Sequence, residues 1–438
     1  MKSYSIQTSK TDFLEQFREA ESSFIPQLKQ LKSEAISNLA SIGFPSTKNE
    51  DWKYTNVAPL LANTFNRSEE KFNLTRNDIK YFLPEDSNAC LMVFENGRLN
   101  LELSSLGLLP NGIIAGNIRD HYSHPSVKMH LGKIAMHANE SFVALNTALF
   151  QEGAFIFAEK NVALEKPIHL LFVNDARFAP TVCYPRNFII ASPGSRLSVS
   201  ESYYSIDTTH ASFCNPVTEI FVDDNAQLEY CKNEAGNAND YHIDYTGAML
   251  RRDSRLYCHT ITSGGKMVRN NLRIELQQPN GSAYLNGLYI TSGETHVDNH
   301  SFIDHASPDC YSNELYKGVL SGRSHGVFNG KIFVRSDAQK TNAFQSNKNI
   351  LLSDEASVNA KPQLEIYADD VKCSHGATTG QLDPLAMFYL RSRGIGENNA
   401  RIMLTNAFAE EILDRITIES TREKLKDLIH SRFMKGNE

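Results

Sequence analysis

From about residue 154 to residue 378 the sequence is a long series of short apolar or alternating segments, and this series limits the fold more than any other feature. Clusters of Gly, Asn, Asp and Pro separate the segments about every eight to twelve residues, which is typical of strands joined by tight turns. The pattern therefore predicts an all-β region. No strict hexapeptide or nonapeptide repeat is visible, so pattern alone leaves a sandwich, a jelly roll and a β-helix open. The clearest segments are FIFAE, IHLLFV, NFIIAS, RLSVSES, TEIFV, RLYCHTI, NLRIEL and KIFVR.

Helical periodicity flanks this β region on both sides. Residues 9–43 predict two helices, the first with a stripe of Phe13, Leu14 and Phe17. The second is expected to be capped by Ser22 or Ser23, to carry Pro26 in its first turn and to end at Gly43. After Asp383-Pro384 the period returns, and Ser420 with Glu423 predicts a capping box at the start of a last helix.

Between the first helices and the β region, the Asn-Gly pair within residues 91–100 predicts a tight hairpin of two short strands. One more helix is predicted over residues 132–149, with Ile134, Phe142, Leu145 and Leu149 on its apolar face. The chain is thus expected to comprise four parts. They are an N-terminal helical domain (1–85), a transition segment (86–150), a β core (151–378) and a C-terminal helical domain (379–438).

Composition limits the class of function. The 438 residues include 44 basic and 51 acidic side chains, a formal charge of −7, so no global positive field would hold nucleic acid or an anionic membrane. The N-terminus lacks an apolar core for a secretory signal, and no apolar run reaches the roughly 18 residues of a bilayer span. We therefore expect a cytoplasmic protein with neither nucleic acid nor membrane as partner.

The seven cysteines are scattered, with no Cys-x-x-Cys pair. This spacing disfavours a zinc knuckle and a disulfide framework, and it means that this chain alone lacks the clustered thiolates that would fully ligate an iron–sulfur cluster. Two glycine-containing segments, GVFNGKI at 326–332 and GIGENN at 394–399, lack the spacing of a Walker A loop and of a dinucleotide fingerprint. The sequence therefore predicts no nucleotide site.

The densest group of reactive side chains is YADDVKCSHGAT, at residues 367–378. If this segment is a strand, its period of two places Asp369, Val371, Cys373 and His375 on one face. A soft thiolate beside an imidazole suits iron or an iron–sulfur cluster. A buried cysteine next to a hydrogen-bonded histidine is the alternative interpretation.

A second group, HVDNHSFIDH at residues 296–305, holds three histidines and two aspartates. In a strand His305 points away from His296 and His300, so coordination of one metal by all three is strained. Solvated or core histidines are the alternative interpretation. The segment shows no nucleophile elbow or catalytic triad.

These segments resemble the SufB/SufD family of iron–sulfur cluster assembly proteins. The resemblance is carried by KNEDWKYT at 48–55, by VDNHSFIDH, by the long stretch from VFNGKIFVR through CSHGATTGQLD, and by FYLRSRGI at 388–395. It is strongest over residues 297–411. Within the family, CSHGAT is typical of SufD-like chains, because Gly376 stands where SufB-like chains usually carry a glutamate.

The resemblance implies a mainly β fold, with a right-handed parallel β-helix core between N-terminal and C-terminal α-helical domains. It also implies a scaffold, with no enzymatic activity of its own, that pairs with a SufB-like subunit and binds SufC-like ABC ATPases. His375 would then face a cysteine of the SufB-like subunit across the interface where a nascent iron–sulfur cluster forms, with Cys373 as a neighbour. The surface that receives the ATPase would include Phe388, Arg391, Arg393, Gly394, Phe408 and Glu410.

Two other functions stay open. One is a β-helix enzyme acting on polysaccharide, in which Asp298 and Asp304 would perform acid–base chemistry. The missing export signal and the absence of paired carboxylates in an aromatic groove disfavour it. The other is an interaction module without a ligand. The sequence also leaves open whether the isolated chain binds iron, sulfide or a flavin, and whether it forms homodimers through exposed strand edges.

Overall fold

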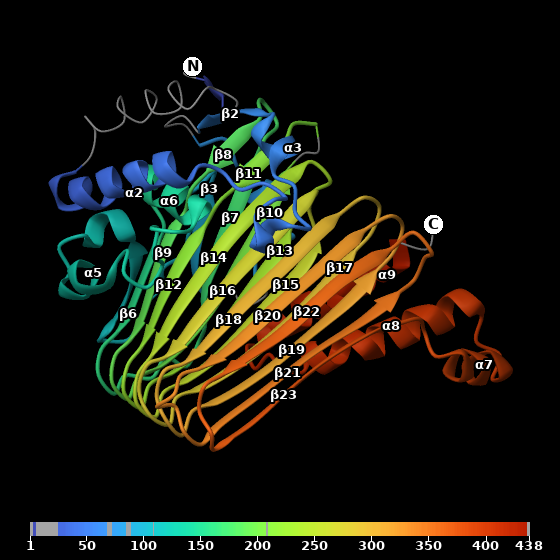
Figure 1. Cartoon of the computed structure of the whole chain (residues 1–438). Coiled ribbons are helices and arrows are strands. Elements are labelled where there is room, and N and C mark those ends of the chain that lie inside the picture. The colour runs from blue at the N-terminus through green and yellow to red at the C-terminus, as the bar shows by residue number, and fades with distance from the viewer. Residues whose placement is uncertain are drawn as a thin grey trace.

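The centre of the molecule is a β-solenoid of about seven turns, flanked by helices at both ends of the chain (Figure 1). The computed structural model describes residues 3–5, 25–67, 72–84, 89–107, 109–206 and 209–435. Within these residues, each coil of the solenoid contributes one strand to each of two sheets. Two strands that are neighbours in one sheet therefore have a strand of the other sheet between them in the sequence. This arrangement confirms the predicted fold class, a mainly β protein with a parallel β-helix core.

The two sheets are named sheet A and sheet B, and the C-terminal helices pack on sheet B. The main strands of sheet A are β6 (Ala154–Ala158), β9 (Arg186–Ala191), β12 (Val217–Val222), β14 (Asp240–Leu250), β16 (Met267–Leu276), β18 (His296–His305), β20 (His325–Val334) and β22 (Ser357–Ile366). The main strands of sheet B are β3 (Cys90–Glu95), β7 (Ile168–Asp175), β10 (Arg196–Ile206), β13 (Gln227–Ala235), β15 (Arg255–Gly264), β17 (Ser282–Thr291), β19 (Tyr311–Leu320), β21 (Thr341–Leu351) and β23 (Val371–Gly380).

Shorter strands complete the two sheets. They are β1 (Ser3–Ser5), β2 (Thr64–Arg67), β5 (Ile113–Asn117), β8 (Thr181–Cys183) and β11 (Ser212–Cys214) in sheet A and β4 (Arg98–Leu99) in sheet B. β3 and β4 form the predicted hairpin, with Phe94 opposite Leu99. Its turn residues Asn96 and Gly97 both have positive φ, as a two-residue hairpin turn requires.

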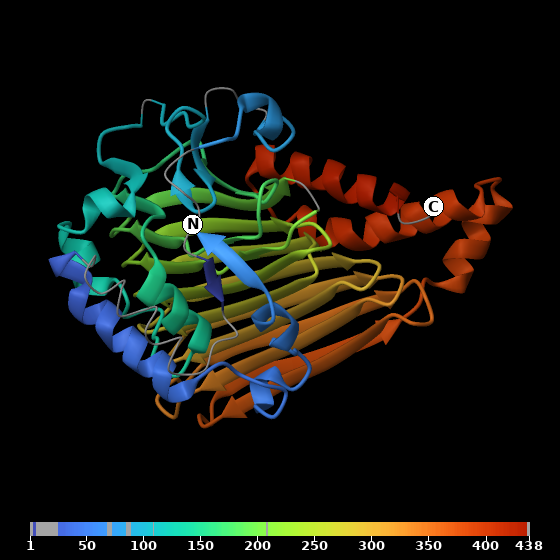
Figure 2. The ribbon, with the colours of Figure 1, turned by 90° about the horizontal axis from the view of Figure 1, so that it is seen from above.

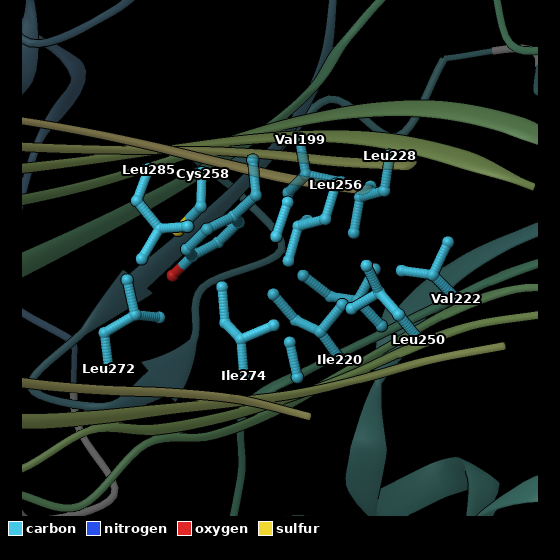
Figure 3. Close-up of a cluster of buried hydrophobic side chains, with 14 of the residues drawn as sticks. Val199, Ile220, Val222, Leu228, Leu250, Leu256, Cys258, Leu272, Ile274 and Leu285 are labelled. Atoms are coloured by element: carbon cyan, nitrogen blue, oxygen red, sulfur yellow. The ribbon is translucent and has the colours of Figure 1, made fainter. Parts of the chain in front are cut away.

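The core lies between the two sheets, because every second side chain of each strand points inward. Figure 3 shows Val199, Leu228, Leu256 and Leu285 of sheet B facing Ile220, Leu250 and Ile274 of sheet A. All belong to one buried cluster that extends from β3 to the last coil. Elsewhere on these strands, some inward-pointing side chains are polar, and Lys232 and Asp244 form a buried ion pair there.

The turns from sheet A to sheet B repeat one backbone conformation. Asp253, Asn280, Asp309 and Lys340 each adopt a positive φ close to 60°. Each donates its backbone N–H to a carbonyl one coil further on, over 3.1 Å to Pro279, 3.4 Å to Pro308, 2.9 Å to Gln339 and 2.6 Å to Asp370, in that order. Asp and Asn tolerate this left-handed conformation because their side chains are short, whereas Lys340 does so at a cost.

Helices cover the outer faces of both sheets (Figure 2). The N-terminal region packs mainly on sheet A, although Leu74 and Ile79 pack on β3 and β7 of sheet B, and the C-terminal helices pack on sheet B. The N-terminal helices are α2 (Lys29–Ile42), α3 (Ala58–Leu61), α4 (Arg76–Ile79), α5 (Pro125–His130) and α6 (Ser141–Leu149), with 3-10 turns at Pro26–Leu28, Glu50–Trp52 and Ile118–His121. The C-terminal helices are α7 (Pro384–Ser392), α8 (Glu397–Leu413) and α9 (Glu419–Lys435).

Two local predictions are wrong. The helix predicted over residues 132–149 begins only at Ser141, because the backbone amides of Gly132, Ile134 and Ala135 donate instead to the carboxylate of Glu219. Ser420 is not a cap, since α9 begins one residue before it and includes it. The predicted first helix, with Phe13, Leu14 and Phe17, and the caps Ser22 and Ser23 lie outside the described residues. Pro26 opens a 3-10 turn ahead of α2.

The turn geometry predicts that Lys340→Gly stabilises the protein. Glycine removes the cost of the left-handed conformation, about 1–2 kcal/mol. Its greater conformational freedom in the unfolded chain lowers the stability by about 0.5–1 kcal/mol and so offsets part of this gain. We expect the free energy of unfolding to rise by about 0.5–1 kcal/mol, measured by urea denaturation. Asn280→Gly is the matched control, and it should change stability by less. A destabilised Lys340→Gly protein would contradict this account of the turns.

Candidate functional site

The last coil of the solenoid is open. Among the described residues, β22 pairs only with β20 and β23 pairs only with β21, so each of these two strands has one edge without a partner strand. The side chains of β23 are exposed or half-buried, whereas those of β17 and β19, earlier in sheet B, are mostly buried. An unpaired strand edge offers a row of backbone donors and acceptors to another chain. Figure 1 shows β23 at the end of sheet B, next to β21.

His375 and Cys373 both lie on β23, on the side chain face that points into the solenoid. Val371 and Cys373 pack against the end of the main hydrophobic cluster. His375 is the next residue on that face, and it is exposed because no further coil covers it. The structure therefore brings the predicted thiol and imidazole together on one face of an edge strand.

Two buried polar side chains of the preceding coils lie in register with His375 on the inner face of sheet B, and the three positions are called one column. His375 is opposite Gln345 of β21, and Gln345 is opposite Glu314 of β19. The Gln345 amide Nε2 donates to Glu314 Oε2 over 2.7 Å, and both side chains are at most 3% exposed. Burial raises the pKa of Glu314 to about 7, although hydrogen bonds from Ser301 and Gln345 oppose the shift. Sequence reasoning missed both residues.

The cysteines differ sharply in exposure. All seven are described, six are buried, and Cys373 is half-buried. Burial raises the pKa of the Cys373 thiol, so the thiol form dominates at neutral pH. Among the described residues, no group of three or more His, Cys, Asp and Glu side chains is arranged to hold a metal ion. His375 and Cys373 could thus supply part of a metal centre, and the other ligands would have to come from elsewhere.

The second histidine group lies on β18, away from the open end. His305 points inward and hydrogen-bonds Ser312, while His296 and His300 are on the outer face. The carboxylate of Asp298 is 2.6 Å from Arg269 Nη1 and 3.0 Å from His300 Nε2. Burial alone would raise the pKa of Asp298, but the Arg269 guanidinium and the His300 imidazole outweigh it and hold the pKa well below its usual range.

This electrostatic setting does not suit glycoside cleavage by Asp298 and Asp304. A general acid needs a raised pKa, and that of Asp298 is shifted the other way. Asp304 is held by a different arginine, with its Oδ2 2.7 Å from Arg335 Nη2. The two carboxylates therefore have separate structural partners, and the geometry gives no support to the polysaccharide alternative.

The segment KNEDWKYT attaches the N-terminal region to sheet A. The Trp52 ring lies 3.7 Å from the Arg269 guanidinium, and Thr55 Oγ1 lies 2.8 Å from His296 Nε2. Between this segment and the outer face of β16, β18, β20 and β22 runs a groove of about 780 Å³. Its lining mixes cationic, amide and aromatic side chains, among them Arg273, Asn329 and Phe302.

The residues predicted to receive an ATPase lie on α7, on α8 and, for Arg393 and Gly394, in the turn between these helices. α7 has no buried residue, and its Leu385, Phe388 and Tyr389 side chains are 78%, 71% and 57% exposed. Arg391, Arg393, Gly394 and Glu410 are also exposed. Phe408 differs, because its ring packs against the solenoid and lies 4.1 Å from Lys317 Nζ. Figure 1 shows α7 projecting beyond the sheets.

The fold and the site together define a class of protein: a β-solenoid whose open last coil exposes a histidine beside a half-buried cysteine. Comparison with known families gives the family of the chain. Residues 172–408 match the family described as "SUF system FeS cluster assembly, SufBD core domain", and residues 6–170 match "SufBD protein N-terminal region". The chain therefore belongs to the SufBD family, which functions in iron–sulfur cluster assembly.

Individual relatives cover nearly the whole chain. An iron–sulfur cluster assembly SufBD family protein of Synechocystis is 33% identical over 91% of this chain and 89% of its own. The iron–sulfur cluster assembly protein SufD of Escherichia coli is 30% identical over 92% of both. The chloroplastic protein ABCI7 of Arabidopsis thaliana is 26% identical over 93% of this chain and 86% of its own.

The cytoplasmic location stays a prediction, and flavin binding, which the sequence left open, gains no support. One of these three relatives is named as chloroplastic, so relatedness does not decide where this chain works. In the part of the chain that the structure describes, none of the helices is long and apolar enough to cross a membrane. Two of the three names refer to iron–sulfur clusters, and none refers to a flavin.

The cysteine environments predict the order of alkylation by iodoacetamide. Cys373 should react first, and the six buried cysteines should react only after unfolding. The thiolate is the reactive form, so a raised pKa shifts the rise in the Cys373 rate to a higher pH than the roughly 8.5 of a free thiol. Peptide mapping by mass spectrometry over a pH series measures both effects. Earlier labelling of any buried cysteine, or a rate that levels off like that of a free thiol, would contradict the assignment.

Proposed function

We propose that this chain is the SufD-like scaffold subunit of a cluster assembly complex, and that it holds a nascent iron–sulfur cluster together with a SufB-like subunit. The partner binds against the open coil formed by β22 and β23. The cluster is cargo that forms between the two chains, with His375 as a ligand from this side and Cys373 close to it. The chain positions the cluster and has no enzymatic activity of its own.

One observation carries this proposal: the exposed imidazole of His375 stands on an unpaired edge strand, where a second chain has direct access to it. A ligand buried inside the solenoid would need no partner, and an isolated surface histidine would offer no strand edge for docking. The incomplete ligand set of the described residues supports the same view, because an iron–sulfur cluster needs several thiolate or imidazole ligands. Family membership supplies the type of cargo.

The test is cluster formation with His375→Gln. The purified complex with SufB-like and SufC-like subunits is reconstituted anaerobically, and cluster content is measured by absorbance and iron analysis. We expect the complex to assemble normally and cluster content to fall to background. The variant should change the free energy of unfolding by no more than about 0.5 kcal/mol, because His375 is exposed.

His430→Gln is the matched control, since His430 is also exposed but lies on α9. This variant should keep the cluster content of the unmodified complex. Full cluster content in His375→Gln would reject His375 as a ligand and, with it, the proposed site.

We further propose that α7 receives the SufC-like ATPase. Its three large apolar side chains are exposed along a helix that buries none of its residues, as expected of a helix that packs against another protein. Arg391 and Arg393 add positive charge beside them. Phe408 contributes indirectly, because its contact with Lys317 fixes α8 on the solenoid.

Phe388→Ser is expected to weaken binding of the ATPase about 10- to 30-fold, the usual effect of removing an aromatic side chain at the centre of an interface. Titration calorimetry with the purified SufC-like ATPase measures the dissociation constant. Tyr81→Ser removes an aromatic ring of similar exposure far from α7 and should leave the constant unchanged. Equal affinities for the two variants would show that α7 is not the docking helix.

A further inference from the structure

The side chain of Gln345 is buried with only one of its two polar atoms hydrogen-bonded to the described residues. It is 3% exposed, and its Nε2 donates to Glu314. Its Oε1 is fully enclosed and has no hydrogen-bond partner among the described residues. Leaving a buried carbonyl oxygen unpaired costs about 1–3 kcal/mol, so such an atom calls for a donor that is not in place.

The imidazole of His375 is the side chain best placed to supply that donor. Gln345 and His375 are directly opposite each other on adjacent strands and point to the same face. Beyond β23 the sheet ends, so on that side His375 is the only register partner of Gln345 within the described strands. An imidazole N–H that turns toward the solenoid would therefore meet the Gln345 oxygen.

Two neighbours fix the amide in the required orientation. Glu314 Oε2 accepts the hydrogen bond from Gln345 Nε2, so the carboxyl group holds the amide nitrogen and the amide oxygen lies on the other side. On the facing strand β20, Gly330 leaves the space that the amide occupies, since a Cβ atom at this position would lie 2.3 Å from Gln345 Nε2. The amide nitrogen is thus bonded to Glu314 and lies against Gly330 of the opposite sheet, and neither of these neighbours contributes a donor to the amide oxygen.

We propose that Gln345 is a positioning residue for His375: its Oε1 accepts a hydrogen bond from one ring nitrogen of the imidazole and so selects a single tautomer. The other ring nitrogen then keeps its lone pair and faces out of the open end, ready to bind iron. Metal-binding histidines commonly have such a partner on the second nitrogen, and it orients the ring. Glu314 acts through Gln345. This inference rests on the proposed function, in which His375 is a cluster ligand.

The tautomer can be measured without any metal. The full chain is labelled with ¹⁵N in its histidine rings, and the ring signals of His375 are assigned by their loss in His375→Gln. We expect one dominant tautomer in the unmodified chain. In Gln345→Leu the shifts should move to the tautomer mixture that the same ring shows in the denatured chain. Gly330→Ala, which displaces the amide but keeps it, should produce a shift in the same direction.

Asn347→Leu is the matched control. Asn347 is a buried amide on the same strand, but it bonds Tyr289 and Tyr316 and is opposite Ala377. This variant should leave the His375 tautomer unchanged. In the reconstituted complex, Gln345→Leu should slow cluster formation about 10- to 100-fold, the usual effect of losing the partner of a metal-bound histidine, and Asn347→Leu should not.

The inference is overturned if His375 in the unmodified chain already shows the mixture of the denatured chain, or if Gln345→Leu leaves its tautomer unchanged. These results are separate from a failure of the proposed function. If His375→Gln still forms clusters at the full rate, the proposed function fails, whereas the ¹⁵N shifts still decide whether Gln345 holds the ring. If His375→Gln abolishes cluster formation but Gln345→Leu leaves the His375 tautomer unchanged, the proposed function stands and Gln345 is not a positioning residue.

Discussion

Backbone hydrogen bonding between successive coils is the constraint on which the rest of this structure depends. Each strand of a parallel sheet satisfies its N–H and C=O groups only through its neighbours, and here each neighbour belongs to the coil before or after. The turns repeat this rule, with the amide of each left-handed residue bonded to the following coil. A further coil could pair with the last coil in the same way, so the strands of the last coil necessarily have unpaired edges.

The same constraint places the functional groups. A side chain that points inward is buried wherever another coil follows, as for Glu314 and Gln345, and exposed where none does, as for His375. One column of the stack therefore passes from a buried carboxyl through a buried amide to an accessible imidazole. The end of the solenoid thus combines the polar lining of a protein interior with access for a second chain. That combination suits a cluster shared between subunits.

Much of this could be predicted from local patterns. The β region, the Asn-Gly hairpin and the shared face of Cys373 and His375 follow from alternation and turn chemistry, which act over a few residues. The helix predicted over residues 132–149 fails because a distant carboxylate, Glu219, binds its first amides. Gln345 and Glu314 were missed because their link to His375 is a register between coils about 30 residues apart, which alternation within one strand does not reveal. A signal was present in the turns, since Ser292-Gly293 and Ser321-Gly322 recur at about that spacing.

The central claim is that the open end of this chain gives an imidazole nitrogen to a cluster completed by another subunit. Pulsed electron paramagnetic resonance tests it directly, in a reconstituted and reduced complex in which only this chain carries ¹⁵N-histidine. The account predicts a ¹⁵N hyperfine coupling of the size expected for a directly bound nitrogen, and its loss when the labelled chain is the His375→Gln variant. A paramagnetic cluster with no ¹⁵N coupling would contradict the claim.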